Sequence, residues 1–290
     1  MPDFPIIDSH VHLWDPAHFR MEWLDANQRL NKTFGLAEYD EHTAGIQVEG
    51  MVYLEVDLAP EYKLLEAQWV DALAQQDGRL KAIVASAPLE YGEQVRAFLE
   101  ALVAVGPRVK GVRRLLQGES DPAYCLQPRF VRGVQLLPEF GLSFDICVYH
   151  PQLASAVELV RRCPETSFIL DHIGKPNIRG HQLDPWRSEI DALAALPNVV
   201  CKVSGATTEA DLEHWTVDDV APYVNHVLAA FGEDRVVYGG DWPVVLNASP
   251  YKRWAETLDT LTASLSPQAK RKLWADNARR FYRLDEGGAG

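Results

Sequence analysis

The chain has 290 residues, 47% of them hydrophobic, so it is long enough for one large domain with a substantial core. Its formal net charge is −13, which argues against nucleic acid and anionic membranes as partners, because both need clustered lysine and arginine. No window approaches the roughly 20 apolar residues of a membrane span.

Eight short segments rich in valine, isoleucine and leucine recur along the chain. Near-continuous apolar runs of this kind are typical of parallel strands that are buried on both faces. We expect strands at residues 4–8, 50–56, 80–86, 109–116, 142–149, 167–172, 198–205 and 235–241.

Amphipathic helical patterns lie between these strands, at residues 59–76, 91–105, 127–141, 150–162, 184–196 and 216–231. In the first of them Tyr62, Leu65, Trp69 and Leu73 form one apolar stripe, which we expect to face the core. Alternation of this kind predicts a (β/α)8 TIM-type barrel in a single domain, residues 1–285, followed by a disordered tail at 286–290. A doubly wound open sheet is the rival, but no glycine-rich turn follows the first strand.

Two histidines, His10 and His12, follow the first apolar run. Side chains two residues apart on a strand point to the same side, so both imidazoles would face one way, which suits a metal ion. The stretch at 13–49 that follows them is long and irregular. We expect it to form a loop at the rim of the barrel and leave open whether it is a lid.

Polar side chains also end most of the other predicted strands. The carboxyl ends of barrel strands meet at one rim, where the active sites of such enzymes lie. In chain order, these residues are Glu55 and Asp57, Arg113 and Arg114, Tyr149 and His150, Asp171, His172 and Lys175, Lys202 and Ser204, and Asp241 with Trp242.

Four motifs in this order, "DSHVHLW", "LDHIGKP", "GGDWPV" and "NARRFYRL", resemble the amidohydrolase superfamily. More narrowly, they resemble the amidohydrolase-2 branch of lactonases, which includes L-fuconolactonase, L-rhamnonolactonase and 2-pyrone-4,6-dicarboxylate lactonase. The resemblance covers residues 4–283. It implies an enzyme that hydrolyses a lactone to a hydroxy acid.

The resemblance also implies roles for individual residues. His10, His12, His172 and Asp241 match the family's metal-site positions, and Glu55 is a further candidate ligand. We expect one divalent ion, zinc by the chemistry of its ligands, because no carboxylated lysine of the two-metal members is found. Some members of the branch work without metal, so metal dependence stays open. Asp241 would be the general base and then the general acid, with His172 as the second catalytic group.

Further residues are expected to bind the substrate. Arg113 and Arg114 alternate in direction, so only one of them should face the pocket. The resemblance implies that it is Arg113, which shares a strand face with Gly111, whereas Arg114 should pair with the helix layer. Lys175 would bind the developing anion or the sugar hydroxyls. Tyr149 and His150 end the fifth strand, although His150 could simply begin a helix. Trp14 and Trp242 flank site motifs and are expected to form pocket walls.

Three other functions stay open at this point. The first is hydrolysis of a carboxylated or aromatic-derived lactone, for which Arg113, Arg114 and Lys175 could bind carboxylates. The second is metal-dependent, non-oxidative decarboxylation, which related barrels perform. The third is a sugar-binding barrel without catalysis. Asp241 could also serve only as a helix cap.

The cellular setting follows from smaller signals. The N-terminus lacks the basic stretch and apolar run of a secretory signal, so we expect a cytoplasmic protein whose partner is a small-molecule lactone. Whether several copies associate stays open. The four cysteines form no close pair and are expected to be reduced, mostly buried thiols: Cys125, Cys147, Cys163 and Cys201.

Overall fold

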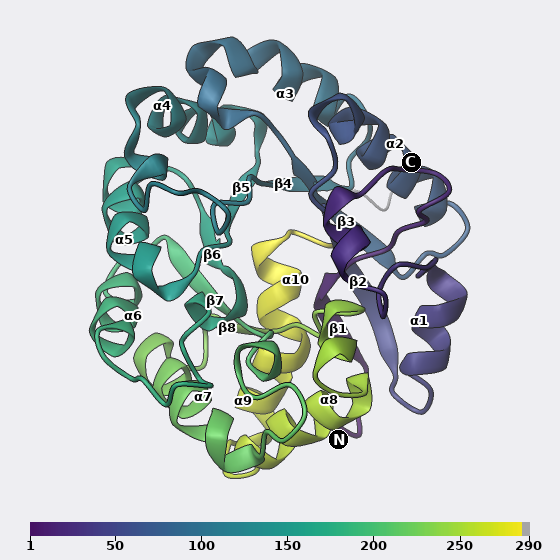
Figure 1. Cartoon of the computed structure of the whole chain (residues 1–290), viewed down its shortest axis with the longest axis vertical. Helices are drawn as coiled ribbons and strands as arrows, with labels where there is room; N and C mark the ends of the chain where they lie inside the picture. The colour runs from purple at the N-terminus through teal and green to yellow at the C-terminus, as the bar shows by residue number, and fades with distance from the viewer. Residues whose placement is uncertain (286–290) are drawn as a thin grey trace.

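Eight parallel strands pair in chain order in the computed structural model, which describes residues 1–285. Each strand is hydrogen-bonded to the next one along the chain, and helices surround the strands (Figure 1). The strands are β1 (Ile6–Val11), β2 (Val48–Leu54), β3 (Leu80–Ser86), β4 (Val109–Arg113), β5 (Ser143–Ile146), β6 (Phe168–Leu170), β7 (Val199–Val203) and β8 (Val236–Tyr238).

The sheet closes where β1 meets the segment that follows β8. The backbone N–H of His12 donates to the carbonyl of Trp242 at 2.7 Å, and the N–H of Asp241 donates to the carbonyl of His10 at 2.9 Å. These bonds join the first strand to the last and confirm the predicted (β/α)8 barrel over the open sheet. They also place His10 and His12 beside Asp241, which are predicted site residues from opposite ends of the chain.

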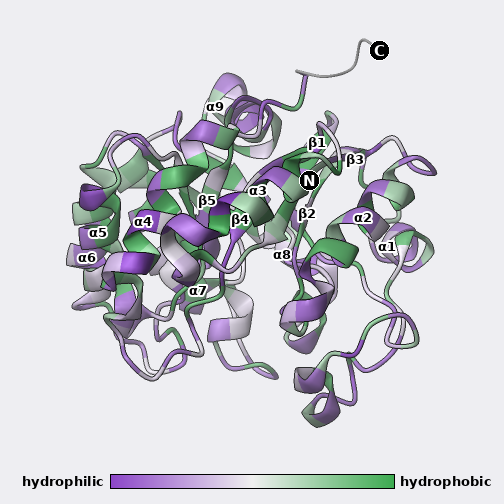
Figure 2. Cartoon of the chain, turned by 90° about the horizontal axis from the view of Figure 1, so that it is seen from above, coloured by the Kyte–Doolittle hydropathy of each residue, from purple (hydrophilic) through white to green (hydrophobic). Residues whose placement is uncertain are grey.

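Most of the helices cover the outside of the barrel, much as the periodicity predicts, whereas the last one packs on the interior of the barrel. They are α1 (Leu36–His42), α2 (Lys63–Ala74), α3 (Arg96–Val103), α4 (Pro128–Leu136), α5 (Leu153–Arg162), α6 (Trp186–Ala194), α7 (Val217–Phe231), α8 (Tyr251–Leu261), α9 (Pro267–Arg271) and α10 (Asn277–Phe281). Hydrophobic residues gather on strands such as β1 and β2, whereas helices such as α4 carry residues of both kinds (Figure 2).

Two local predictions differ from the structure. The stretch at 13–49 is not irregular throughout, because it contains α1, where the N–H of Gly35 donates to Glu38 Oε2 at 2.8 Å and caps the helix. On α2, Leu65 is 49% exposed and Glu66 is buried instead. The Glu66 carboxylate accepts hydrogen bonds from the Tyr53 hydroxyl and the Val56 N–H, and these bonds stabilise it in the core.

The C-terminal segment packs against the inside of the barrel. Ala275, Ala278 and Tyr282, on and beside α10, share one apolar cluster with Ile7 of β1 and Val237 of β8. In Figure 1, α10 accordingly lies over the middle of the ring of strands. The described residues thus form one barrel domain, and the predicted tail at 286–290 lies outside them.

Two further observations bear on the sequence predictions. All four cysteines are buried free thiols, as predicted. Among the residues that the structure describes, no helix has both the length and the apolar character needed to cross a bilayer.

Candidate active site

An irregularity in β1 turns His10 and His12 toward the inside of the barrel. Ile7 belongs to the interior cluster, so strict alternation would point His10 toward the helices. The pairing register shifts between Asp8 and Val11, however, and the N–H of His10 donates to Asp8 Oδ1 at 3.1 Å. A bulge of this kind reverses the alternation and sends both imidazoles inward.

Asp8 fixes this bulge from a fully buried position. Its carboxylate accepts hydrogen bonds from the Gly240 N–H at 2.7 Å, from the Tyr251 hydroxyl at 2.8 Å and from the Tyr39 hydroxyl at 3.0 Å. Because Gly240 directly precedes Asp241, the same carboxylate holds the end of β8 against β1.

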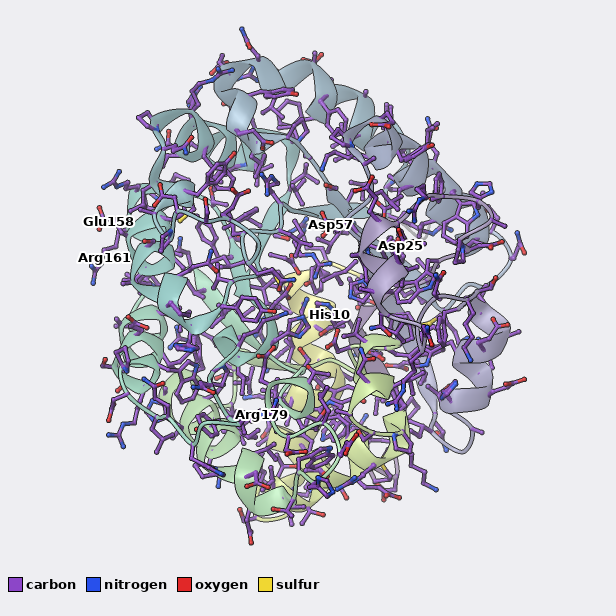
Figure 3. All side chains as sticks on the ribbon, in the orientation of Figure 1. His10, Asp25, Asp57, Glu158, Arg161 and Arg179 are labelled. Carbon is purple, nitrogen blue, oxygen red and sulfur yellow. The ribbon has the colours of Figure 1, made fainter. Side chains whose placement is uncertain are left out.

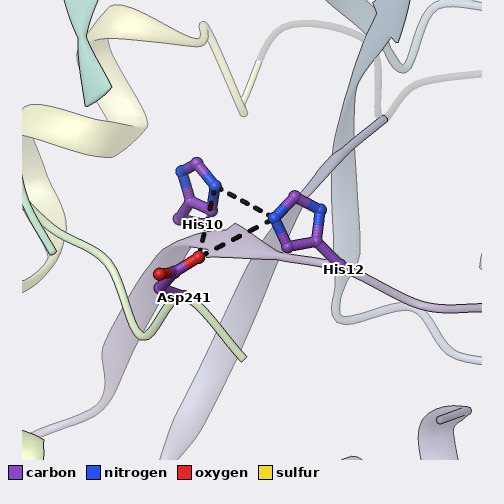
Figure 4. Close-up of side chains that lie close together, drawn as sticks. All are labelled: His10, His12 and Asp241. Atoms are coloured by element: carbon purple, nitrogen blue, oxygen red, sulfur yellow. Dashed lines mark hydrogen bonds and ion pairs between the residues drawn. The ribbon is translucent and has the colours of Figure 1, made fainter. Parts of the chain in front are cut away.

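The structure brings the three histidines and Asp241 together. His10 Nε2 and His12 Nε2 are 3.2 Å apart. Asp241 Oδ1 lies 3.7 Å from His10 Nε2, 3.8 Å from His12 Nε2 and 3.9 Å from His172 Nε2. Figure 4 shows His10, His12 and Asp241 pointing toward one another. Donor atoms spaced in this way can share one ion at about 2.0–2.2 Å.

The outer nitrogens of these imidazoles have partners that orient the rings. His12 Nδ1 lies 2.8 Å from the Leu54 carbonyl, which can only accept, so the proton sits on Nδ1 and the Nε2 lone pair faces the site. His172 Nδ1 is 2.9 Å from the Ser204 hydroxyl. His10 Nδ1 lies 3.4 Å from Asp171 Oδ1. Metal-binding histidines generally have such outer partners.

Electrostatics also suits a cation. Burial lowers the pKa of His10, His12 and His172, that of His12 to about 3, so all three imidazoles are neutral ligands near neutral pH. Burial raises the pKa of Asp241 to about 7, against the opposing charges of Lys175 and Arg113. Its Oδ1 is buried without a hydrogen-bond partner among the described residues, so the donor set fits a divalent ion.

Backbone strain is concentrated at the same rim. Asp57, His172, Lys175 and Asp241 adopt φ angles between 43° and 55°, a left-handed region that residues other than glycine rarely adopt. All four side chains line one cavity of about 350 Å³. Clustered strain of this kind is typical of functional sites, since the surrounding structure must stabilise it.

The cavity contains most of the predicted substrate-binding residues. Trp14, Arg113, Lys175 and Tyr149 line it together with His12, His172 and Asp241. In Figure 3, His10 lies near the middle of the barrel, whereas Glu158 and Arg161 of α5 lie at its outer edge. Further lining residues are Trp23, Asn27, Leu30, Val56, Asp57, Leu115, Gln117, Cys147, Thr208, Glu209, Val244 and Asn247.

Three predicted site residues lie elsewhere. Trp242 is fully buried against Phe34, Tyr39 and His42, because its backbone pairs with β1 while its ring points outward. His150 begins the short 3₁₀ helix η6 (His150–Gln152) and does not line the cavity.

Glu55 is the third of these residues and is not placed as a ligand. Its Oε1 lies 2.6 Å from Arg113 Nε, and its Oε2 accepts from the Asp57 N–H at 2.8 Å, so both carboxylate oxygens are already engaged.

Asp241 does not cap a helix, because the short helix after it begins at Val244 with no side-chain cap.

Sequence reasoning missed the ion pairing of one cluster and several residues that line the cavity. Asp145, Asp171 and Lys202 form a buried ionic cluster behind His10. The sequence places Asp171 and Lys202 at strand ends, but it does not show that they pair with each other and with Asp145, because the three residues come from three different strands or strand ends. Trp23, Asn27 and Asn247 reach the cavity from short 3₁₀ helices or the residue next to one, where no local pattern marks them.

Comparisons with known proteins show which proteins this chain is similar to. The amidohydrolase family model Amidohydro_2 matches residues 7–284. An L-fucono-1,5-lactonase of Burkholderia multivorans is 30% identical over 297 residues, which cover 97% of this chain and 96% of that protein. An L-rhamnono-gamma-lactonase of Scheffersomyces stipitis is 25% identical, covering 98% of this chain and all of that protein.

A solved structure is similar over the same length. The crystal structure of an amidohydrolase from Burkholderia multivorans with bound zinc superposes with a TM-score of 0.87, at 28% identity, over 97% of this chain and 100% of that chain. The match of the family model over nearly the whole sequence confirms the resemblance that the four motifs indicate. This chain therefore belongs to the amidohydrolase-2 family of enzymes.

Proposed function

We propose that this enzyme opens the ring of a neutral sugar lactone and releases the corresponding hydroxy acid. The observation that carries the proposal is the buried Asp241 carboxylate, whose Oδ1 faces three imidazole Nε2 atoms at the end of a cavity. The names of the relatives, L-fucono-1,5-lactonase and L-rhamnono-gamma-lactonase, support the substrate class.

The site would hold one divalent ion, which we propose to be zinc. His10, His12 and Asp241 would bind it, with His172 beside them. Neutral imidazole and carboxylate are ligands that zinc prefers, and a similar solved structure contains zinc. When bound, the ion supplies Lewis-acid polarisation of a carbonyl oxygen.

Asp241 would move the protons of the reaction. Its carboxylate accepts a proton from water as the water oxygen attacks the lactone carbonyl carbon. It then returns that proton to the ring oxygen when the bond between this oxygen and the carbonyl carbon breaks. The product is a hydroxy acid, which ionises near neutral pH. Burial raises the pKa of Asp241 to about 7 in the metal-free protein, and a bound cation would lower it, which favours the ionised carboxylate that accepts the proton.

The charges that line the cavity favour a neutral substrate. Arg113 is paired with Glu55 and Asp171, and Lys175 Nζ donates to Gln117 Oε1 at 2.6 Å and lies 3.9 Å from Glu209. A carboxylated lactone would have to compete with these partners for both cations, so this alternative is less favoured. Hydroxyl groups instead match the uncharged polar side chains of Asn27, Gln117 and Asn247.

Aromatic side chains provide the apolar part of the binding surface. Trp14 and Trp23 line the cavity, and their rings meet edge to face with centroids 5.3 Å apart. The Trp14 indole N–H donates to the Lys32 carbonyl at 2.9 Å, which fixes the ring. A rigid aromatic wall would suit the C–H face of a sugar ring.

A substrate panel tests the proposal. We expect aldonolactones to release acid with kcat/KM of about 10⁴ M⁻¹s⁻¹ or more, the lower end of ordinary enzymes. A 2-pyrone-dicarboxylate and a dihydroxybenzoate should react at least about tenfold more slowly, a difference of about 1.4 kcal/mol. Acid release reports hydrolysis, and carbon dioxide release reports decarboxylation. If the 2-pyrone-dicarboxylate or the dihydroxybenzoate reacted faster than the aldonolactones, the corresponding alternative function would replace the proposal. Binding of an aldonolactone without any turnover would favour the sugar-binding barrel.

A further inference from the structure

We infer that Asp171 and Lys202 are positioning residues for His10, and that the hydroxyl of Tyr282 at the C-terminal helix holds them in place. The inference rests on the proposed metal site, because its consequence is the affinity of that site for zinc. It assigns a role to the C-terminal segment, which lies on the opposite side of the cluster from the cavity.

The first contact lies behind His10. Asp171 Oδ1 is 3.4 Å from His10 Nδ1, the ring nitrogen on the opposite side of the imidazole from His12 and Asp241. Both side chains are fully buried. A carboxylate and an ammonium packed against this nitrogen restrict the rotation of the imidazole and thereby keep Nε2 on the side of His12 and Asp241.

Two cations hold the Asp171 carboxylate. Lys202 Nζ lies 2.8 Å from its Oδ1, and Arg113 Nη1 lies 3.3 Å from its Oδ2. The Lys202 ammonium is also 3.2 Å from His10 Nδ1. A cation cannot share this space with the ammonium, so the grouping of His10, Asp171 and His172 is not a second metal site. Asp171 therefore acts through His10 and does not bind the ion itself.

Lys202 is held in turn from the far side. Its ammonium lies 2.9 Å from Asp145 Oδ2, and that oxygen also accepts a hydrogen bond from the Tyr282 hydroxyl at 2.8 Å. Lys202 Nζ is 5.7 Å from the centre of the Tyr282 ring as well. All three side chains are fully buried, so their positions depend on one another and not on solvent.

These side-chain contacts form one continuous route, by which we mean a chain of buried contacts that links the C-terminal segment to His10. It runs from Tyr282, the residue that follows α10, through Asp145 of β5, Lys202 of β7 and Asp171 after β6, to His10 of β1. Loss of the Tyr282 hydroxyl frees Asp145 to shift, and Lys202 and Asp171 can then follow it. The expected result is a less well oriented His10 and weaker metal binding.

Zinc affinity tests the route directly. In competition with a chromogenic chelator, Asp171→Asn should raise the zinc Kd about 10–100-fold, the usual effect of losing an outer partner. Tyr282→Phe keeps the ring and every ion pair, and should raise the Kd about threefold or more. In the Asp171→Asn/Tyr282→Phe double variant, Tyr282→Phe should raise the zinc Kd by less than a further factor of about two, because Asp171 no longer connects Tyr282 to His10. The visible spectrum of the cobalt-substituted Tyr282→Phe protein should also change.

A matched control separates this effect from general destabilisation. Thr262→Val removes another buried hydroxyl, which donates to the Leu258 carbonyl at 2.7 Å on α8, and should leave the zinc Kd unchanged. A parent-like Kd for Tyr282→Phe, or full additivity in the double variant, would overturn the inference. If the parent protein itself bound no zinc, the proposed metal site would fail, and the inference with it.

Discussion

Asp241→Asn should lower kcat for lactone hydrolysis by about 10²–10⁴-fold, the usual contribution of general acid–base catalysis. The amide keeps the shape of the side chain but cannot accept the proton of the attacking water. The backbone N–H of Asp241 bonds to His10 and its carbonyl to Val245, and neither bond involves the side chain. The variant should therefore fold like the parent, with kcat measured at saturating lactone and added zinc.

Asp191→Asn is the control for this experiment. Asp191 is an exposed aspartate of α6 that pairs with His226 and does not line the cavity. We expect its kcat to stay within about threefold of the parent, far below the range for a lost general base. Equal losses in both variants, or an Asp241→Asn enzyme that stays within threefold, would move proton transfer to another group, with His172 the next candidate.

Arg113→Met should lower the free energy of unfolding by about 3–5 kcal/mol, the usual cost of removing one partner from a buried ion pair. Arg113 is 3% exposed, its Nε lies 2.6 Å from Glu55 Oε1, and its Nη1 lies 3.3 Å from Asp171 Oδ2. Methionine fills a similar volume but leaves the buried Glu55 carboxylate without its cation. Chemical denaturation of the metal-free protein measures the loss without a contribution from bound zinc.

The neighbouring arginine provides the control. Arg114 points to the other side of β4 and pairs with Glu119 at 2.7 Å and with Glu90 at 3.4 Å, where all three side chains are partly exposed. Solvent screens such pairs, so Arg114→Met should cost about 1 kcal/mol or less. A loss for Arg113→Met no greater than that of the control would show that the buried pairs contribute little to stability.

The barrel was predictable because its signals are local. Near-continuous apolar runs mark each parallel strand, and a helical period follows most of them. The helix α1 was missed because it has only seven residues and depends on its cap at Gly35. Leu65 was placed on the wrong face of α2 because Glu66 is buried by hydrogen bonds from Tyr53 and Val56, which no periodicity reveals.

The candidate site was partly predictable for a similar reason. A spacing of two residues places His10 and His12 on one side of a strand, but only the bulge at Asp8 decides that this side faces the interior. Trp242 follows Asp241 in sequence, yet the two side chains point to different sides of the backbone.

Buried ion pairs were the least predictable part of the site. Glu55 pairs with Arg113, and Lys202 pairs with Asp145 and Asp171. Glu55 and Lys202 both lie at strand ends, but which charges become their partners depends on distances across the barrel. A sequence places each charge at the correct end of its strand. It does not tell which charges neutralise one another and which remain available to a ligand.

The most direct test of the account is the rate of acid release from an aldonolactone as zinc is added to metal-free protein. We predict that the initial rate rises linearly with zinc and reaches a plateau at one ion per chain, because the three histidines and Asp241 surround a single position. A full rate before zinc is added, a plateau only at two ions per chain, or no acid release at any zinc concentration would contradict the account.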